Sequence, residues 1–396
     1  MTKKSDTPAI RFKGFTDTWE QRKVREVTDR YDNLRIPVAA SLRVAGTTPY
    51  YGANGIQDYV DGYTHDGEFI LVAEDGANDL KNYPVKCVKG RIWVNNHAHV
   101  LQGKYDCADN QFLAYAISQA DIESLLVGGG RAKLNAETLM GIDLLLPNKA
   151  EQIRIGKYLA QLDNLITLHQ RKYDKLTNVK KSMLEKMFPK NGSNVPEIRF
   201  KGFTEAWEQR KLGDIGETYT GLSGKTKADF GHGQARFVTY MNVFSNPISN
   251  PEMTEPIEID PKQNEVEVGD VLFTTSSETP EEVGMSSVLL EKRGKTYLNS
   301  FCFGFRPSEK IDSYYLAYML RSESAREKII LLAQGISRYN ISKNKVMEIA
   351  VSLPSLDEQK LIGQCFRQLD HLITLHQREL EKLKNIKKSC LENMFV

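Results

Sequence analysis

Two segments of the chain place basic and amide side chains next to glycine. Their residues are Gly128, Arg131, Lys133, Asn135, Gly335, Arg338, Tyr339 and Asn340. Arginine can form two hydrogen bonds with the edge of guanine, and asparagine can do the same with adenine. A solvated loop or a capped turn would explain either segment alone. Because both segments lie at matching positions of a repeat described below, we favour recognition of a nucleic acid.

Other polar side chains follow expected strands. Alternation predicts a strand over residues 91–101, whose period of two would place its tryptophan, asparagine and histidine side chains on one face. The hydroxyl-rich segment 274–277 follows an apolar run at 268–273, and residues 50–55 are rich in turn formers. The candidate DNA-binding residues are Asn54, Asn95, Asn96, His97, His99, Arg131, Lys133, Thr274, Thr275, Ser276, Ser277, Arg338, Tyr339 and Asn340.

Catalytic motifs fail on spacing. Residues 221–226 read GLSGKT, but Tyr219 stands where a phosphate-binding loop requires its first glycine. The run 128–130 is not a dinucleotide fingerprint that follows a strand. His97 and His99 could share a metal, but no third ligand stands nearby. We therefore expect no catalytic residue, and no metal or cofactor bound by this chain.

The elements that must position the candidate residues occur twice. Residues 10–23 and 198–211 are identical at 12 of 14 positions, and residues 146–189 and 353–396 at 26 of 44. The stretches between these blocks differ greatly, and the second is 19 residues longer. A repeated frame around a variable module predicts two modules that do the same kind of job on different targets.

The longer block of each copy predicts a helix. Its apolar positions step by three and four over more than four heptads, which indicates a coiled-coil-like seam. The matching seams predict that the two helices pair, and we expect them to pair antiparallel. For the two seam histidines, a polar residue that fixes register is favoured over a catalytic or metal role. The seam residues are Leu162, Ile166, His169, Tyr173, Leu176, Leu369, Ile373, His376, Leu380 and Leu383.

The variable modules read as strands followed by helices, with helices predicted over 109–126 and 312–332. The predicted fold class is α+β, with two modules separated by a pair of long antiparallel helices and related by a pseudo-twofold axis. The predicted domain limits are 1–147 and 190–354 for the modules, and 148–189 and 355–396 for the helices.

Composition removes other classes of protein. The chain has 396 residues, of which 40% are hydrophobic and 26% charged, as in ordinary globular proteins of two or three domains. The net charge of +2 conceals a net +5 on blocks 151–189 and 357–396 and −3 elsewhere. No apolar run approaches the roughly 20 residues of a membrane helix, and the five cysteines are scattered. These features predict a cytoplasmic protein with reduced thiols.

The doubled motifs resemble the specificity subunit of type I restriction-modification systems over essentially the whole chain. The first motif, F-x-G-F followed by W-E, contains Phe12, Gly14, Phe15, Trp19 and Glu20, and again Phe200, Gly202, Phe203, Trp207 and Glu208. The helix motif contains Leu146, Pro147, Glu151, Gln152, Leu162 and Asp163, and again Leu353, Pro354, Glu358, Gln359, Leu369 and Asp370.

The resemblance implies a non-catalytic, DNA-binding subunit of the bacterial cytoplasm. Each module would be a target-recognition domain that reads one half of a split double-stranded DNA site, and the helix pair would set the gap. The frame would bind two methyltransferase subunits that carry S-adenosylmethionine and methylate adenine. Two endonuclease subunits that use ATP and Mg²⁺ would complete the complex.

Two other classes of function remain as alternatives. A coiled-coil adaptor whose modules bind protein or glycan would show no sequence-specific binding to duplex DNA. A self-contained nuclease or methyltransferase would be active as an isolated chain, but the absence of cofactor and metal motifs counts against it.

Overall fold

The computed structural model describes residues 7–128, 132–190 and 192–395, which form two compact units. Unit 1 comprises Met1–Gln170 and Arg378–Val396, and unit 2 comprises Arg171–Gln377. The units therefore divide both long helices, whereas the predicted domain limits separate each helix from its module. Each unit contains one variable module, the first part of its own helix and the last part of the helix from the other repeat.

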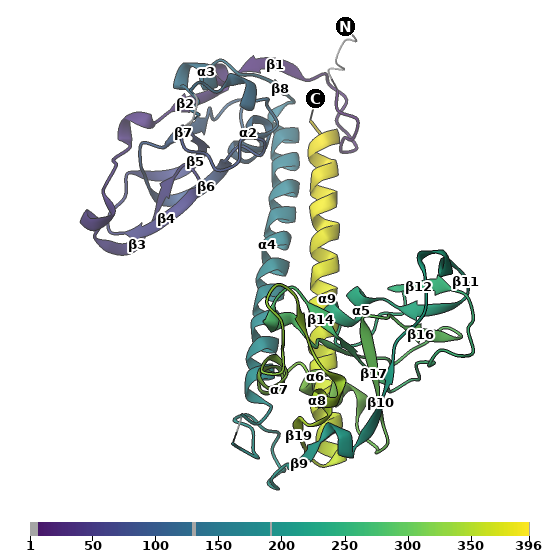
Figure 1. The fold of residues 1–396 in the computed structure, drawn as a ribbon. Helices are drawn as coiled ribbons and strands as arrows, with labels where there is room; N and C mark the ends of the chain where they lie inside the picture. Colours follow the sequence, from purple (N-terminus) through teal and green to yellow (C-terminus); the bar gives the residue numbers. More distant parts are fainter. Residues whose placement is uncertain (1–6, 129–131, 191, 396) are drawn as a thin grey trace. The chain divides into compact units, whose positions relative to one another are not determined.

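Unit 1 is built around a six-stranded mixed sheet with the order β2-β7-β5-β6-β3-β4 (Figure 1). The central strand β5 contains the apolar run Phe69–Ala73, whose residues are all buried. The strands are β2 (Thr28–Arg30), β3 (Ala45–Gly52), β4 (Gly55–Val60), β5 (His65–Ala73), β6 (Val85–Val94) and β7 (Ala98–Gly103). A separate antiparallel pair joins β1 (Glu20–Lys23) to β8 (Asp143–Leu146).

The strand predicted over residues 91–101 is wrong, because a turn at residues 96–97 separates β6 from β7. The Asn95 side-chain oxygen accepts the His97 N–H at 2.8 Å, which stabilises the turn. Each of the two strands then pairs with β5. The side chains expected on one strand face consequently belong to two strands and the turn that joins them.

Polar side chains mark the start of α2 and the turn that follows it. The Asp109 carboxylate accepts the Phe112 N–H at 2.8 Å and so caps α2 (Asn110–Ser118). The helix predicted over 109–126 ends early, because Asp121 and Ser124 hydrogen-bond to each other in a new turn. The other helices are α1 (Val24–Val27), α3 (Ala136–Met140) and α4 (Lys149–Lys186), and short 3₁₀ turns lie at Asp32–Leu34, Ala40–Leu42 and Glu123–Leu125.

Unit 2 contains two principal sheets in place of one. The first has the order β10-β17-β13-β15, and the second has the order β12-β11-β16. Their strands are β10 (Gly216–Thr220), β11 (Phe230–Val238), β12 (Thr254–Ile257), β13 (Val271–Thr274), β15 (Ser286–Val288), β16 (Thr296–Leu298) and β17 (Cys302–Pro307). Two short antiparallel pairs join β9 (Glu208–Lys211) to β19 (Ala350–Leu353), and β14 (Ser276–Ser277) to β18 (Tyr339–Asn340).

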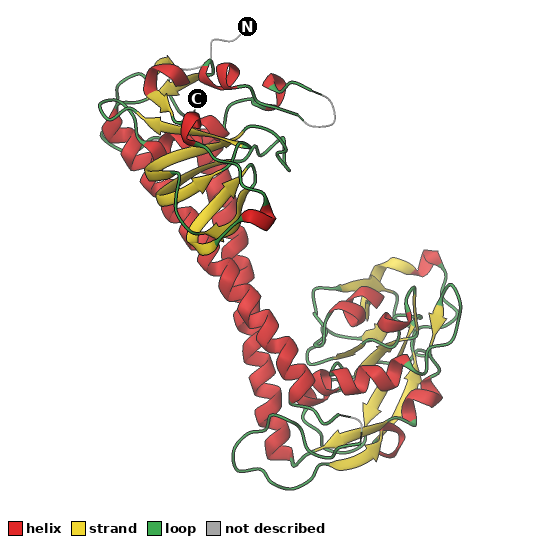
Figure 2. Ribbon diagram, turned by 90° about the vertical axis from the view of Figure 1, so that its left-hand side faces the viewer, coloured by secondary structure: helices red, strands yellow, loops and turns green. Residues whose placement is uncertain are grey.

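The helix predicted over 312–332 is two helices. The Ser322 hydroxyl accepts the Ala325 N–H and starts a second helix where the first one ends. The helices of unit 2 are α5 (Tyr240–Ser245), α6 (Ser313–Met319), α7 (Glu323–Ile330), α8 (Lys343–Met347) and α9 (Leu356–Asn393), with 3₁₀ turns at Leu212–Asp214, Lys227–Asp229 and Pro280–Glu282. Helices and strands remain largely segregated within each unit, so the predicted α+β class is confirmed (Figure 2).

The long helices pair antiparallel within each unit. In unit 1, the Lys387 ammonium of α9 lies 2.5 Å from the Asp163 carboxylate of α4, which also accepts the Tyr115 hydroxyl at 2.6 Å. In unit 2, Lys180 of α4 lies 2.5 Å from Asp370 of α9, whose carboxylate accepts the hydroxyl of a tyrosine of α6 at 2.7 Å. Each aspartate therefore meets the lysine of the other repeat.

The predicted seam residues are less exposed than their neighbours along each helix. Leu162 and Leu380 are buried, and the other eight are partly buried. Two further contacts agree with the antiparallel direction: the Tyr158 hydroxyl lies near the Cys390 thiol in unit 1, and Phe188 stacks on Phe366 at 5.8 Å in unit 2.

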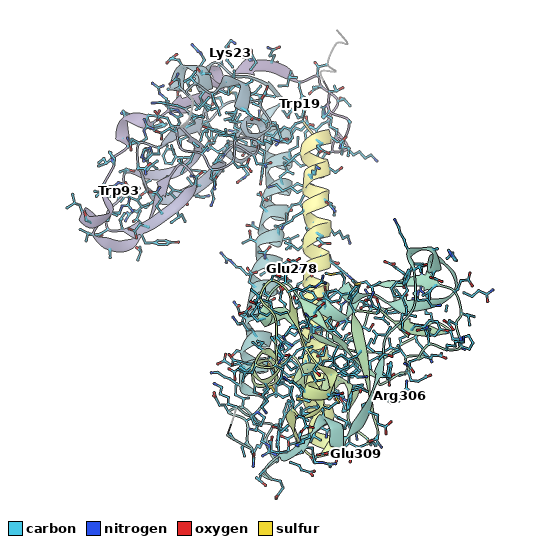
Figure 3. All side chains as sticks on the ribbon, viewed as in Figure 1. Trp19, Lys23, Trp93, Glu278, Arg306 and Glu309 are labelled. Atoms are coloured by element: carbon cyan, nitrogen blue, oxygen red, sulfur yellow. The ribbon has the colours of Figure 1, made fainter. Side chains whose placement is uncertain are left out.

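Aromatic residues at the helix ends complete both cores. In unit 1, Phe395 after α9 lies 6.4 Å from Trp19 and stacks on Phe112 at 5.4 Å. In unit 2, Phe188 after α4 lies 6.4 Å from Trp207. Figure 3 shows Trp19 beside the end of α9 and Trp93 at the far end of the same unit. Each core thus requires a residue from the other repeat.

Candidate nucleic-acid interface

The two glycine loops have the same base. Val127 and Lys133 exchange backbone hydrogen bonds of 2.9 Å in both directions. Gln334 and Asn340, each 207 residues later, exchange hydrogen bonds of 2.9 and 2.8 Å. The same pair of backbone hydrogen bonds therefore joins equivalent residues in both units. Arg131 lies outside the described residues.

Each loop continues into a buried anchor. In unit 1, the Leu134 N–H donates to the Glu74 carbonyl at 2.7 Å, and in unit 2 the Ile341 N–H donates to the Thr275 carbonyl at 2.9 Å. The Leu134 side chain is 0% exposed and that of Ile341 is 7% exposed. Both anchors lie where the chain leaves a central strand, β5 in one unit and β13 in the other. The two modules therefore share this feature although their sheets differ.

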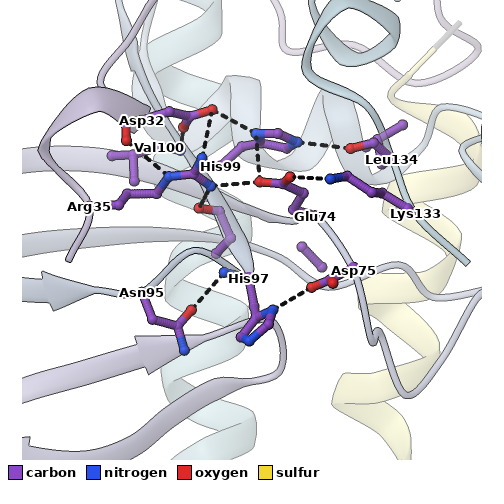
Figure 4. A network of polar contacts seen from close by, with 12 residues as sticks. Asp32, Arg35, Glu74, Asp75, Asn95, His97, His99, Val100, Lys133 and Leu134 are labelled. Atoms are coloured by element: carbon purple, nitrogen blue, oxygen red, sulfur yellow. Dashed lines mark hydrogen bonds and ion pairs between the residues drawn. The ribbon is translucent and has the colours of Figure 1, made fainter. Parts of the chain in front are cut away.

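A polar network supports the loop of unit 1 (Figure 4). His99 is 1% exposed, its Nδ1 lies 2.8 Å from the Asp32 carboxylate, and its Nε2 lies 2.9 Å from the Leu134 carbonyl. Both partners are hydrogen-bond acceptors, and they face the two nitrogens of the ring. His99 contacts the Leu134 carbonyl from inside the protein, and its ring is too buried to read DNA.

Charged groups surround this histidine. The Glu74 carboxylate accepts hydrogen bonds from Arg35 at 2.7 Å and Lys133 at 2.8 Å. Burial alone would raise the pKa of Glu74, but the hydrogen bonds from Lys133 and Arg35 lower it. Burial would likewise raise the pKa of Asp32, but hydrogen bonds from His99 and the Val100 N–H lower it below its usual range. Both carboxylates are thus held in their charged form.

Several predicted contact residues of unit 1 instead hold turns together. Asn95 is 4% exposed, and its amide nitrogen lies 3.4 Å from the Gln57 side-chain oxygen. Asn54 donates to the Gly76 carbonyl at 2.9 Å and accepts the Asn78 N–H at 2.9 Å, although its side chain is exposed. Local hydrogen bonds of this kind are the commonest use of asparagine in turns.

Three other predicted residues of unit 1 remain accessible at or beside the network. Asn96 is exposed in the turn between β6 and β7. The His97 side chain is 33% exposed, and its Nδ1 lies 2.5 Å from the Asp75 carboxylate. Lys133 is 46% exposed while it pairs with Glu74. Together with the exposed Asn54, these three side chains are the described residues of the predicted set that DNA could reach in unit 1 without displacing the fold.

In unit 2, the structure brings the two predicted clusters together. Ser276 pairs with Asn340, and Ser277 pairs with Tyr339, in the short β14–β18 ladder. The hydroxyl side chains are largely engaged within the protein. The Thr274 hydroxyl accepts the Met285 N–H at 3.0 Å, the Thr275 hydroxyl donates to the Phe301 carbonyl at 2.8 Å, and the Ser277 hydroxyl lies 3.2 Å from the Glu282 carboxylate.

The exposed part of this cluster is basic and apolar. The Arg338 guanidinium lies over the Phe301 ring at 5.9 Å, and Phe301 is 55% exposed. Ile336 at the loop is 96% exposed, and Asn340 is exposed beside it. We did not select Phe301 or Ile336 from the sequence. β17 begins only at Cys302, and Phe301 lies in the turn that precedes it.

No group of three or more histidine, cysteine or acidic residues in the described ranges is arranged to hold a metal ion. His97 and His99 point to different partners, Asp75 and Asp32. In the same described ranges, none of the helices has the length and apolar character needed to cross a membrane.

Comparison with known proteins agrees with these features. The family model for the type I restriction modification DNA specificity domain matches residues 16–178 and 204–385. A type I restriction enzyme specificity subunit of Methanocaldococcus jannaschii is 24% identical over 343 residues, which cover 81% of this chain and 77% of that protein. A Haemophilus influenzae protein named as such a subunit is 44% identical over 146 residues, and the match spans only 38% of its length.

Among solved structures, the S subunit of a type I restriction-modification system from M. genitalium has the same fold. Its TM-score is 0.62 at 16% sequence identity, and the match covers 98% of this chain and 99% of that one.

Proposed function

This chain belongs to the family of type I restriction-modification DNA specificity domains, and we propose that each unit reads one half of a two-part DNA site. The observation that supports this proposal is the pair of equivalent loops, Val127–Lys133 and Gln334–Asn340, which have the same base and anchor in differently built modules. A shared loop position is suited to a shared task, and different surroundings are suited to different base sequences.

The surroundings of the two loops differ chemically. The loop of unit 1 is flanked by charged and imidazole groups, including His97 and Lys133. The loop of unit 2 presents Arg338 and Asn340 beside the exposed ring of Phe301. Because base recognition depends on the placement of donors, acceptors and apolar groups, these two surfaces would prefer different half-sites. The complete site would therefore be asymmetric.

The shared frame supports docking of two copies of one partner. Exposed leucines recur at identical places on the long helices, Leu165 and Leu168 in unit 1 and Leu372 and Leu375 in unit 2, with 40–47% exposure. Packing within the chain does not require leucine at such exposed sites. We propose that methyltransferase subunits cover them and supply S-adenosylmethionine for adenine methylation, and that endonuclease subunits add ATP and Mg²⁺ for restriction.

The chain itself would perform no chemistry, and its paired helices would set the gap between the half-sites. The net charge outside helix blocks 151–189 and 357–396 is −3, so the modules offer little general attraction for phosphate. We expect the isolated chain to bind DNA weakly and without specificity, and the assembled complex to bind its site tightly.

The test uses the complex of this chain with its methyltransferase subunits. The methylated motif is first read by single-molecule sequencing, and methylation is then measured on duplexes altered in one half at a time. Arg338→Ala should relax discrimination in the half read by unit 2 by about 5- to 150-fold, the range of a lost base contact of roughly 1–3 kcal/mol. Discrimination in the other half should not change.

Lys310→Ala provides the matched control, because Lys310 is an exposed cation of unit 2 outside the loop and its strands. An equal loss in both halves for Arg338→Ala would indicate a phosphate contact or a structural role. Finding no two-part methylated motif at all would refute the proposed function.

A further inference from the structure

Between Asp32 and the anchor of the recognition loop in unit 1 lies one buried imidazole, that of His99. We propose that His99 is a positioning residue: it holds the loop base in the geometry that reads the first half-site, without touching DNA. This inference rests on the proposed function and adds a specificity-determining residue to it. The relevant contact joins His99 Nε2 to the carbonyl of Leu134, the residue directly after the loop, at 2.9 Å.

The histidine is itself held in place from the opposite side. Its Nδ1 lies 2.8 Å from one Asp32 carboxylate oxygen, and the other oxygen accepts the Val100 N–H at 2.7 Å. The ring is 1% exposed, so water cannot replace either contact without a rearrangement. A buried ring between two fixed acceptors has one orientation, and in that orientation it holds the Leu134 carbonyl in place.

Charged groups from three segments close around the same ring. The Arg35 guanidinium donates to the Ala98 carbonyl and to Glu74, at 2.8 and 2.7 Å. Lys133, the last residue of the loop, reaches Glu74 from the other side at 2.8 Å. Glu74 lies 3.7 Å from His99 Nδ1, and its own carbonyl accepts the Leu134 N–H. Leu134 is thus fixed at both its N–H and its carbonyl.

Unit 2 has the same backbone anchor but none of its described histidines beside it, which provides an internal comparison. Ile341, the residue equivalent to Leu134, donates its N–H to the Thr275 carbonyl. The described histidines of unit 2 lie elsewhere: His232 faces Glu258 at 3.2 Å, and His371 and His376 belong to α9. Changing His99 should therefore affect one half-site and leave the other as a control.

Two substitutions separate the two contacts of the ring. The amide nitrogen of glutamine can occupy the place of Nε2, and that of asparagine the place of Nδ1. His99→Gln retains a donor for the Leu134 carbonyl, whereas His99→Asn retains the contact with Asp32 and loses the loop. In the methyltransferase complex, we expect His99→Asn to reduce discrimination in the first half-site about tenfold, equivalent to ~1.4 kcal/mol, as for one lost buried hydrogen bond.

His99→Gln should keep discrimination in the first half-site within about threefold, and neither variant should alter the second half-site. An unchanged first half-site in His99→Asn would overturn the proposal. An equal loss of discrimination in both variants, or in both half-sites, would also overturn it. A residue needed only for folding would not be rescued by glutamine and would not affect one half-site alone.

Hydrogen–deuterium exchange of the wild-type complex keeps the proposal testable if His99→Asn does not fold. Peptides that contain Leu134 should exchange as slowly as those from β7, and fast exchange there would overturn the role of His99. If the wild-type complex shows slow exchange but methylates no two-part site, the proposed function fails while the anchoring contact stands.

Discussion

Gly156 in α4 provides the sharpest test of how a module attaches to its helix. An added β-carbon at this position would lie 2.8 Å from the Phe112 nitrogen and 2.9 Å from the Asp109 carboxylate oxygen. These two atoms are the cap of α2, joined by a hydrogen bond of 2.8 Å. Gly363 in α9 repeats the arrangement against the cap of α6. Gly156→Ala therefore forces the start of α2 away from α4.

Two opposing effects decide the sign of this change. Alanine in a helix interior is about 1 kcal/mol more favourable than glycine. Loss of an N-cap costs roughly 0.5–2 kcal/mol, and overpacking a tight contact costs about 1–3 kcal/mol more. We expect a net loss of roughly 2 kcal/mol, which lowers the melting temperature of a unit of this size by about 4–8 °C.

Thermal unfolding followed by far-UV circular dichroism measures this loss. Asn164→Ala is the matched control, because Asn164 is exposed on the same helix and alanine should stabilise it by a few tenths of a kcal/mol. A Gly156→Ala variant as stable as the wild type, or more stable, would refute the close approach of α2 to α4. Faster hydrogen exchange at residues 110–115 in the variant would locate the damage.

Two further predictions concern assembly and acid. The double variant Leu165→Ser, Leu168→Ser should weaken assembly with the methyltransferase subunit at least tenfold, as measured by analytical ultracentrifugation. Its melting temperature should stay within about 2 °C of the wild type, because both side chains are exposed. Unchanged assembly would exclude this face from docking. The pKa of Asp32 is lowered in the folded protein, so this group stabilises the fold at pH values above its unfolded pKa of about 3.9, and the stabilisation is lost as the pH falls through the folded pKa. Asp32→Asn should therefore flatten the acid side of the curve of unfolding free energy against pH for unit 1. An unchanged slope of that curve between pH 2 and 5 would contradict the network.

Much of the frame could be predicted from local patterns. A helix needs only neighbouring residues to form, so steps of three and four identified α4 and α9 and the positions of their seams. The near-identical blocks also identified the repeat, and with it the family. Helix ends inside the modules were less predictable, because Ser322 and Asp121 interrupt helices that remain apolar in composition.

The candidate site was predicted only in outline. The matching glycine loops were found from spacing, and their equivalence became visible in the hydrogen bonds at their bases. Asn95 and His99 were expected on one strand face, but both are buried, and a turn that one asparagine oxygen stabilises interrupts the expected strand. Whether a polar side chain is free to contact a DNA base or is bound to a carbonyl of the protein depends on its burial. The spacing of residues along the sequence does not determine burial.

The sequence by itself determined that this protein has two modules, two long amphipathic helices and a repeated frame, since repetition and helical periodicity are properties of neighbouring positions. Only the tertiary structure decided which repeat completes which core. Lys387 meets Asp163, and Phe395 packs on Trp19, so residues more than 200 positions apart share one unit. The two copies are too similar for the sequence to indicate which helix end packs against which module. The antiparallel pairing of the helices decides this, because it brings the end of each helix to the module of the other repeat.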